Sequence, residues 1–283
     1  MESSFLQALR AVVGDVGVVE DLADRIAYEC DALTSLRAVP GVVVLPSTTD
    51  QVQDVVRLCY TAGVSFVARG SGTGLSGGAM PEEDGVLIVL TRLNQILDVD
   101  PANFRMTVQP GVTNLDISRC VAPFGLYYAP DPSSQQVCSI GGNVAENSGG
   151  AHCLKYGFTF HHVLGLEVVL PDGTPVHLGG PVVDTPGFDL VGSLVGSEGT
   201  LAIVTKVILR LLRMPESVRT LLAAFESIDS AGKAVSGIIA AGIVPAAAEM
   251  MDRLTIEAAE AAVSPGFPQA EAVLIVEIDG PAA

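Results

Sequence analysis

Residues 68–78 read ARGSGTGLSGG, and five glycines fall within this short stretch. With so many glycines, consecutive backbone N–H groups can turn toward one anion and form a nest. The hydroxyl groups of Ser71, Thr73 and Ser76 add further donors. A diphosphate suits such a loop, because amide dipoles bind it without a basic surface. A glycine-rich surface turn is the alternative that this stretch alone leaves open.

Two better-known glycine loops do not fit the residues that follow. Residues 72–77 match G-x-G-x-x-G, but a dinucleotide-binding Rossmann loop must open a helix at this point. Here Gly78, Pro81 and the acidic residues 82–84 predict a turn before the next strand. A P-loop is also excluded, since no Gly-Lys-Ser or Gly-Lys-Thr follows. What is left is a loop rich in exposed amides.

The sequence before the loop predicts a β-α-β unit. Residues 41–46 and 64–68 are rich in β-branched side chains and are typical of buried strands. Residues 47–63 predict a helix, with Thr48 and Gln51 at capping-box spacing and Gly63 as the stop. Its apolar side chains repeat at i, i+3, i+4 and i+7, namely Val52, Val55, Val56 and Cys59.

The rest of the chain predicts an α+β fold in more than one domain. Further strand-like runs are residues 86–90, 96–99, 106–109, 166–170 and 201–211. After Pro215 the sequence predicts a strand, an Ala-rich helix pair on either side of Pro245, and a terminal strand. We therefore expect an N-terminal helical segment over 1–38, a first domain over 39–215 and a partial second domain over 216–283.

Two further glycine clusters repeat the chemistry of the first loop. Residues 139–143 (SIGGN) and 147–150 (NSGG) combine small side chains for close approach with amides for hydrogen bonding. Residues 196–200 (GSEGT) add the carboxylate of Glu198, which can accept from a ribose or ribityl hydroxyl or simply cap a turn. This repetition favours a bound ligand over unrelated surface turns.

Composition and charge exclude several classes of function. The 283 residues carry 15 basic and 32 acidic side chains, a net charge of −17, so bulk attraction to nucleic acid or an anionic membrane is not expected. The longest apolar stretch, residues 238–248, is interrupted and too short to cross a bilayer. No basic region precedes the apolar part of the amino terminus, so a secretory signal is not indicated. We expect a cytoplasmic protein.

Cysteine and histidine spacing indicates neither a disulfide framework nor a metal site. The five cysteines are widely spaced without a C-x-x-C pair. His161 and His162 are adjacent, lack the i, i+4 spacing of a metal pair and have no carboxylate nearby in sequence, while His177 falls in a predicted exposed hairpin. His152 and Lys155 follow the second cluster and could approach a ligand there, as a base and a cation; structural or surface roles are the alternative.

The stretches ARGSGTGLSGG, PDPSS, SIGGNVAENSGG with HCLKYG, LEVVLPDG and VGSEGTLAIVT occur in this order. Together they closely resemble the FAD-binding fold of the vanillyl-alcohol oxidase type, in particular the flavin subunits of glycolate oxidases and the D-lactate dehydrogenases. The resemblance runs from about Gly41 to Arg213, and residues 216–279 resemble the beginning of the substrate-covering domain of that family. It implies a PCMH-type fold of two α+β subdomains with FAD between them.

The resemblance also implies the cofactor and its site. Some relatives tether FAD through a histidine at the position of Thr73, and threonine cannot form that link, so noncovalent FAD is expected. The diphosphate would lie on residues 69–74, and a cation such as Lys155 near the flavin would stabilise its reduced form. The implied cofactor-binding residues are Arg69, Gly70, Ser71, Gly72, Thr73, Gly74, Pro130, Asp131, Ser134, Gly141, Gly142, Asn143, Asn147, Ser148, Gly150, Glu198, Gly199, Thr200 and Ile203.

The reaction that the resemblance implies is oxidation of a D-2-hydroxy acid, of the glycolate or D-lactate type, to the 2-oxo acid by hydride transfer to flavin N5. In the family, the substrate-binding arginine, the metal-ligating histidines and the basic histidine lie in the carboxyl-terminal domain, and this chain ends before those motifs. We therefore assign no catalytic residue and no metal site, and leave the activity of the chain on its own open. The alternative is a noncatalytic flavin-binding or electron-transfer subunit.

The implied partners are the small hydroxy acid and either other subunits of a glycolate oxidase complex or an electron-acceptor protein. Any attachment to a membrane would be made through such partners. A partial second domain would also leave an edge strand uncovered, which permits homo-oligomers.

Overall fold

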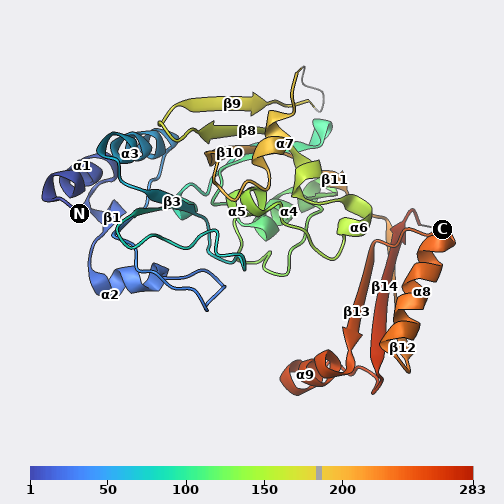
Figure 1. The fold of residues 1–283 in the computed structure, drawn as a ribbon. Helices are drawn as coiled ribbons and strands as arrows, with labels where there is room; N and C mark the ends of the chain where they lie inside the picture. Colours follow the sequence, from blue (N-terminus) through green and yellow to red (C-terminus); the bar gives the residue numbers. More distant parts are fainter. Residues whose placement is uncertain (183–186, 283) are drawn as a thin grey trace. The chain divides into compact units, whose positions relative to one another are not determined.

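The computed structural model describes residues 1–182 and 187–282. The chain divides into two compact units (Figure 1), the first made of Met1–Ser148 and Phe158–Leu212, the second of Gly149–Gly157 and Arg213–Ala283. Residues 1–38, expected as a separate segment, are part of the first unit. The division at Leu212 lies close to the expected boundary after residue 215, but the excursion of residues 149–157 into the second unit had no signal in the sequence.

The described part of the first unit contains both helices and strands. Its helices are α1 (Ser3–Val13), α2 (Leu22–Arg25), α3 (Thr49–Ala62), α4 (Asn114–Val121), α5 (Ile140–Glu146) and α7 (Leu190–Leu194). Its strands are β1 (Val18–Val19), β2 (Val42–Val44), β3 (Phe66–Arg69), β4 (Val86–Val89), β5 (Ile96–Asp100), β6 (Arg105–Val108), β7 (Leu126–Tyr127), β8 (Val163–Val169), β9 (Pro175–Gly179) and β10 (Ile203–Arg210). Short 3-10 turns cover Asp15–Gly17, Ile26–Tyr28, Leu90–Arg92, Pro101–Asn103, Ala122–Phe124 and Thr159–His162.

The first sheet has the order β1-β2-β4-β3 and is parallel apart from β1. Every residue of β2 and β4 is buried, as β-branched side chains are in a sheet covered on both faces. The four predicted apolar residues of α3 are fully buried in the same core as Leu9 of α1. The predicted β-α-β unit is therefore confirmed, and it is β3 that delivers the chain into the glycine-rich loop.

The ends of α3 follow the predicted signals. The hydroxyl of Thr48 accepts from the Gln51 amide, and Gly63 takes the left-handed conformation at the C-cap. The side-chain oxygen of Gln51 accepts a hydrogen bond from the amide of Ser47, at 2.7 Å, instead of from that of Thr48. The helix thus begins and ends where local chemistry predicts, and β3 starts at a defined point.

The second sheet is antiparallel and has the order β5-β6-β10-β8-β9. Burial alternates along β10, so that Val207 and Leu209 face a core completed by Ile117 of α4 and by Ile140 and Val144 of α5. Figure 1 shows α4 and α5 beside this sheet. The packing anchors α5, which carries the second glycine cluster, to a rigid sheet.

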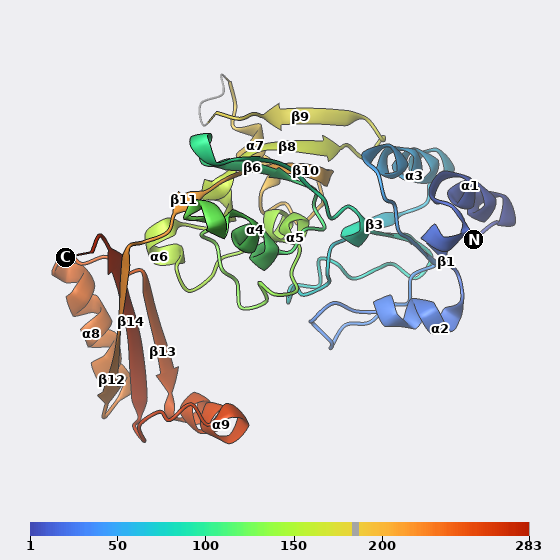
Figure 2. The same cartoon turned by 180° about the vertical axis from the view of Figure 1, so that it is seen from behind.

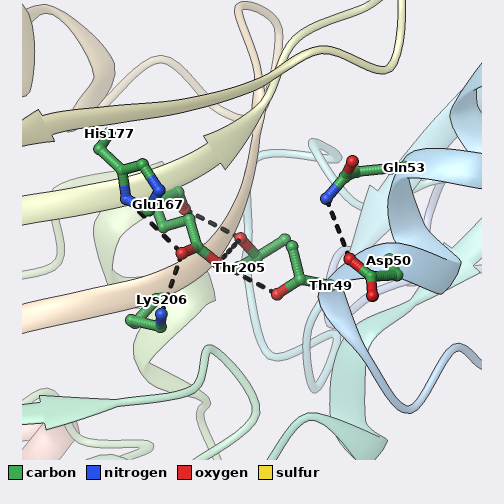
Figure 3. Close-up of polar contacts among 7 residues, drawn as sticks. All are labelled: Thr49, Asp50, Gln53, Glu167, His177, Thr205 and Lys206. Atoms are coloured by element: carbon green, nitrogen blue, oxygen red, sulfur yellow. Dashed lines mark hydrogen bonds and ion pairs between the residues drawn. The ribbon is translucent and has the colours of Figure 1, made fainter.

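A buried carboxylate joins α3 to the second sheet (Figure 3). Glu167 of β8 accepts from the hydroxyls of Thr49 and Thr205, at 3.1 and 3.2 Å, and from Lys206 at 2.9 Å. The ring of His177 lies 3.6 Å away on β9. Burial opposes ionisation of Glu167, but the hydrogen bonds from Lys206 and the two threonines outweigh it and lower the pKa of the carboxyl. The carboxylate therefore holds α3 against the second sheet.

The second unit is a small three-stranded sheet with helices. Its elements are α6 (Cys153–Tyr156), β12 (Ser217–Phe225), α8 (Ile228–Ala240), β13 (Ala247–Asp252), α9 (Arg253–Val263) and β14 (Ala272–Gly280). The strand order is β12-β14-β13, with β14 antiparallel to both neighbours (Figure 2). A short strand, β11 (Leu212–Arg213), marks the division between the units.

One predicted element of this unit is wrong. We expected the second Ala-rich helix to begin directly after Pro245, but residues 247–252 form β13 and the helix begins only at Arg253. Six residue pairs join β13 to β14, and this long-range pairing overrides the helix propensity of the alanines. Asp252 then starts α9 by accepting from the Thr255 amide at 2.8 Å. Among the described residues, no helix is both long and apolar enough to span a bilayer.

Candidate functional site

A cavity of about 300 Å³ lies within the first unit, where the glycine clusters meet. One wall is the loop after β3, and the opposite wall combines α5, the segment before it and the turn before β10. The first wall extends from the first sheet, and the second is anchored to the second sheet. The volume is at the lower end of the range for small-molecule sites. The cavity therefore lies between the two sheets that flank the predicted binding loops.

Residues 70–74 line the cavity, and their amides have no protein acceptors among the described residues. Gly72 has φ +70°, which an L side chain rarely adopts, so the local turn depends on glycine there. Consecutive amides without acceptors are the arrangement that binds a phosphate anion.

Ser139, which immediately precedes α5, faces this loop. Ser139 lines the cavity as a residue, and its hydroxyl is buried with no hydrogen-bond partner among the described residues. A Cβ atom at Gly70 would collide with that oxygen, so the two backbones approach closely only because residue 70 is glycine. A buried hydroxyl without a partner is costly, so this oxygen is suited to bind a ligand.

Two carboxylates lie near Gly78, and a Cβ atom at Gly74 would also lie 3.6 Å from Oε1 of Glu146. A Cβ atom at Gly78 would lie 3.0 Å from Oε1 of Glu146 and 3.3 Å from Oε2 of Glu198, so both crowd the same glycine. Glu146 also accepts from the hydroxyl of Ser76 at 2.9 Å. Carboxylates accept from sugar hydroxyls and repel phosphate, so the anionic part of a ligand belongs at the amides of residues 70–74.

Arg69 is the one basic side chain in the described lining of the cavity. Its guanidinium donates to the carbonyl of Cys30 at 2.8 Å and lies over the ring of Tyr28. Burial lowers the pKa of Arg69 below its ordinary value, against the opposite influence of nearby Asp31. Arg69 thus stabilises the loop through its contacts with Cys30 and Tyr28. The anion-binding groups must then come from the backbone.

The structure brings most of the predicted site residues together around this cavity. Those that line it are Arg69, Gly70, Ser71, Gly72, Thr73, Gly74, Ser134, Gly141, Gly142, Asn143, Ser148, Glu198, Gly199 and Ile203. The described lining leaves out Pro130, Asp131, Asn147, Gly150 and Thr200.

Several of the residues outside the lining have local structural roles. The carbonyl of Pro130 accepts from the Asn114 side chain at 3.0 Å. Asn147 ends α5 in the left-handed conformation and accepts from the Phe160 amide at 2.9 Å. Thr200 donates to the carbonyl of Ser197 within its own turn. Gly150 belongs to the second unit.

The sequence prediction did not single out some lining residues. Ser139 belongs to the second glycine cluster and Glu146 adjoins it, although neither is among the implied cofactor-binding residues; a search for polar side chains in and beside that cluster could have found them. Leu90 and Pro110 also line the cavity, although they are far from every glycine cluster in the sequence. They are brought there by the fold alone.

The histidines and Lys155 have partners of their own. His152 lies 2.8 Å from Glu277, and Lys155 pairs with Asp279, both within the second unit. His162 is buried edge-on against Tyr128, which agrees with a structural role. The side chain of His177 is 76% exposed, as the predicted hairpin requires. No group of three metal-ligating side chains occurs among the described residues.

Comparison with family models gives two matches. Residues 40–179 match the FAD binding domain, and residues 214–283 match the C-terminal domain of FAD linked oxidases. The first match contains the loop with free amides and α5, and the second contains β12, β13 and β14.

Curated relatives cover almost the whole chain. Glycolate oxidase subunit GlcD of Escherichia coli K12 is 52% identical over 279 residues, which are 98% of this chain and 56% of that protein. Glycolate oxidase subunit GlcD of Bacillus subtilis is 45% identical over 97% of this chain and 59% of its own length. A D-lactate dehydrogenase of Anaerostipes hadrus is 38% identical over 77% and 46%. The chain thus spans about half the length of the relatives that it matches.

Solved structures show the same fold. Alkyldihydroxyacetonephosphate synthase superposes with a TM-score of 0.86 at 22% identity, over 99% of this chain and 56% of that one. p-Cresol methylhydroxylase superposes with a TM-score of 0.79 at 19% identity, over 98% and 60%. At this level of identity the likeness concerns the fold, and it confirms the expected α+β, PCMH-type architecture.

Proposed function

Since the chain belongs to the family of FAD-linked oxidases, we propose that it forms the flavin-binding part of an enzyme that oxidises a D-2-hydroxy acid to the 2-oxo acid. The observation that carries the proposal is the row of amides at residues 70–74, which have no protein acceptors within the described chain. The names of the relatives, glycolate oxidase subunit and D-lactate dehydrogenase, support the substrate class.

The residues present fit FAD. Five amides and the hydroxyl of Ser139 offer donors to a diphosphate, and Glu146 and Glu198 offer acceptors to sugar hydroxyls. Thr73 stands where some relatives carry the histidine that tethers the flavin, so we propose that FAD binds noncovalently. When bound, FAD supplies the acceptor for the two electrons and one proton that leave the substrate carbon as hydride.

The work of this chain is to bind and orient the cofactor. The glycines let the backbone approach the diphosphate. One wall of the cavity follows β3 of the first sheet, and the other contains α5, which packs on the second sheet. For the remaining cofactor residues we propose Ser134, Asn143, Ser148, Gly199 and Ile203, which line the same cavity. Pro130, Asp131, Asn147, Gly150 and Thr200 stay proposals that the cavity lining does not support.

The test of cofactor binding uses the purified chain. Titration with FAD should give bound-flavin absorbance and quenched fluorescence at one FAD per chain. Riboflavin, which has no phosphate, should bind far more weakly because it has nothing to offer to the amides of residues 70–74. Equal binding of riboflavin and FAD would contradict the assignment of that loop to the diphosphate.

The test of substrate class follows on the FAD-loaded chain under anaerobic conditions. Loss of flavin colour with D-lactate or glycolate, but not with L-lactate, supports oxidation by the chain itself. Stable FAD binding with no loss of colour favours the second candidate, a flavin-binding subunit that relies on residues from elsewhere. We propose that the partners are other subunits of a complex, since the bacterial relatives are named as subunits.

A further inference from the structure

A polar cluster in the second unit joins α6 to β14. Asp279 accepts from Nζ of Lys155 and, at 2.6 Å, from the hydroxyl of Tyr156. Two residues earlier on the same strand face, Glu277 lies 2.8 Å from Nε2 of His152. We call these five residues the α6 clamp. They bring together positions more than 120 residues apart in the sequence, since each contact spans 123 to 125 residues.

The clamp depends on an ionised and buried carboxylate. The side chain of Asp279 is only 3% exposed, and each of its oxygens has a donor, Lys155 for Oδ1 and Tyr156 for Oδ2. Burial opposes the charge, but the hydrogen bonds from these two residues outweigh it and lower the pKa of Asp279. Removing the charge would leave Lys155, whose side chain is 29% exposed, without its counter-ion.

The clamp lies on an excursion that starts at the candidate cofactor site. The chain leaves the first unit directly after Ser148, which lines the cavity, and returns at Phe158. The base of the excursion is closed, because Thr159 donates to the carbonyl of Ser148 from both its amide and its hydroxyl. The Ser148 amide in turn donates to Asn143, another lining residue. The excursion that carries α6 is therefore joined, at its first residue, directly to a residue of the lining.

We propose that Glu277 and Asp279 are positioning residues for the cofactor site. By holding α6, they restrain the loop that ends α5, and so make the affinity for FAD depend on the second unit. This inference rests on the proposed function, because it takes FAD as the ligand of the cavity. Neither residue needs to touch the cofactor.

The experiment compares variants of the full chain. Asp279→Asn keeps the shape of the side chain and removes its charge. We expect it to raise the dissociation constant of FAD about fivefold, at the lower end of typical coupling between sites. Hydrogen exchange of the amides in residues 149–157 should become faster. Tyr156→Phe removes a single hydrogen bond and should give a smaller rise, which keeps the test available if Asp279→Asn fails to fold.

Two controls separate positioning from general destabilisation. Val273→Ala shortens a fully buried side chain of β14 and leaves the α6 clamp intact. Glu249→Gln changes an exposed carboxylate on β13. Both should leave the FAD dissociation constant unchanged. The proposal is overturned if Asp279→Asn and Tyr156→Phe bind FAD as the wild type does, or if Val273→Ala weakens binding equally.

Failure of the proposed function would be seen separately. If the wild-type chain takes up no FAD, the proposed function fails. Hydrogen exchange of the amides in residues 141–148 then tests whether the α6 clamp restrains the cavity lining. Faster exchange there in Asp279→Asn supports the transmission from α6 to the lining, and unchanged exchange overturns it.

Discussion

At the scale of single residues, the cavity separates groups that stabilise the protein from groups left for a ligand. Arg69 is the only cation in the described lining, yet its guanidinium is already bound to the carbonyl of Cys30. Ser139 is the opposite case, a buried hydroxyl that no described group satisfies. A native structure tolerates such a group where binding satisfies it.

Ser139→Ala should therefore weaken FAD binding without harming the fold. One lost hydrogen bond corresponds to about a two- to tenfold rise in the FAD dissociation constant. The free energy of unfolding of the FAD-free chain should stay equal or rise, by up to about 1–3 kcal/mol, since a buried hydroxyl without a protein partner is costly in the free chain. Titration with FAD and urea unfolding measure the two quantities. Ser236→Ala, on exposed α8, is the control, and unchanged FAD affinity in Ser139→Ala would contradict the role.

At the scale of elements, α5 shows that adjacent glycines can have different reasons to be there. The sequence predicted a loop over residues 139–143, but Gly141 and Gly142 lie in the first turn of a helix. A Cβ atom at Gly141 would come within 2.6 Å of Pro110, whereas one at Gly142 would meet only Ser139, at 3.4 Å. Packing against Pro110 requires the first glycine, whereas the second has room for a side chain.

Gly141→Ala and Gly142→Ala should therefore change stability in opposite directions. Alanine favours a helix over glycine by about 0.5–1 kcal/mol, so Gly142→Ala should unfold at equal or higher urea concentration. Gly141→Ala should lose about 1–3 kcal/mol, because its methyl group must displace the Pro110 backbone. Urea unfolding of the FAD-free chain measures both, and equal effects of the two substitutions would show that the contact with Pro110 is unimportant.

The contact between α3 and the second sheet depends on Glu167, whose side chain is 11% exposed. Glu167→Gln should lower the free energy of unfolding at pH 7 by about 1–3 kcal/mol, because Lys206 loses its counter-ion. Glu82→Gln, in an exposed turn, is the matched control and should cost less than about 0.5 kcal/mol.

The effect of Glu167 should also depend on pH in a defined direction. Its pKa in the folded chain lies below the ordinary value of 4.5, so its contribution is complete well above pH 4.5 and is lost as the pH falls. The difference between wild type and Glu167→Gln should therefore shrink on acidification. A difference that stays constant between pH 7 and acid pH would mean that the carboxylate charge is not what joins α3 to the second sheet.

At the scale of the whole molecule, the proposed site would hold a doubly charged diphosphate in a chain of net charge −17. The local field of the amides at residues 70–74 favours the anion, while the field of the whole protein repels it. Salt screens the long-range repulsion more effectively than the short contacts within a cavity.

Raising NaCl from about 0.05 to 0.5 M should therefore leave FAD binding equal or strengthen it, by up to about threefold, through faster association. Stopped-flow fluorescence measures the association rate. Riboflavin, which carries no phosphate charge, is the control and should show no such dependence. A tenfold loss of FAD affinity with salt would show that exposed cations hold the diphosphate.

What could be predicted from the sequence was local or carried by family resemblance. The N-cap at Thr48, the stop at Gly63 and the turn at Gly72 each depend on a few neighbouring residues. They can therefore be predicted from short stretches of the sequence. The ordered glycine clusters identified the FAD-binding fold, which the family models and solved structures confirm.

The tertiary structure alone decided what depends on distant partners. Residues 247–252 are a strand because β14 pairs with them, although their alanines favour a helix. Leu90 and Pro110 reach the cavity because separate sheets place them there, and residues 149–157 join the second unit because Asp279 and Glu277 bind α6. Burial and pairing act between residues far apart in sequence, whereas caps and turns act between neighbours, and this difference separates what the sequence determined from what the fold decided.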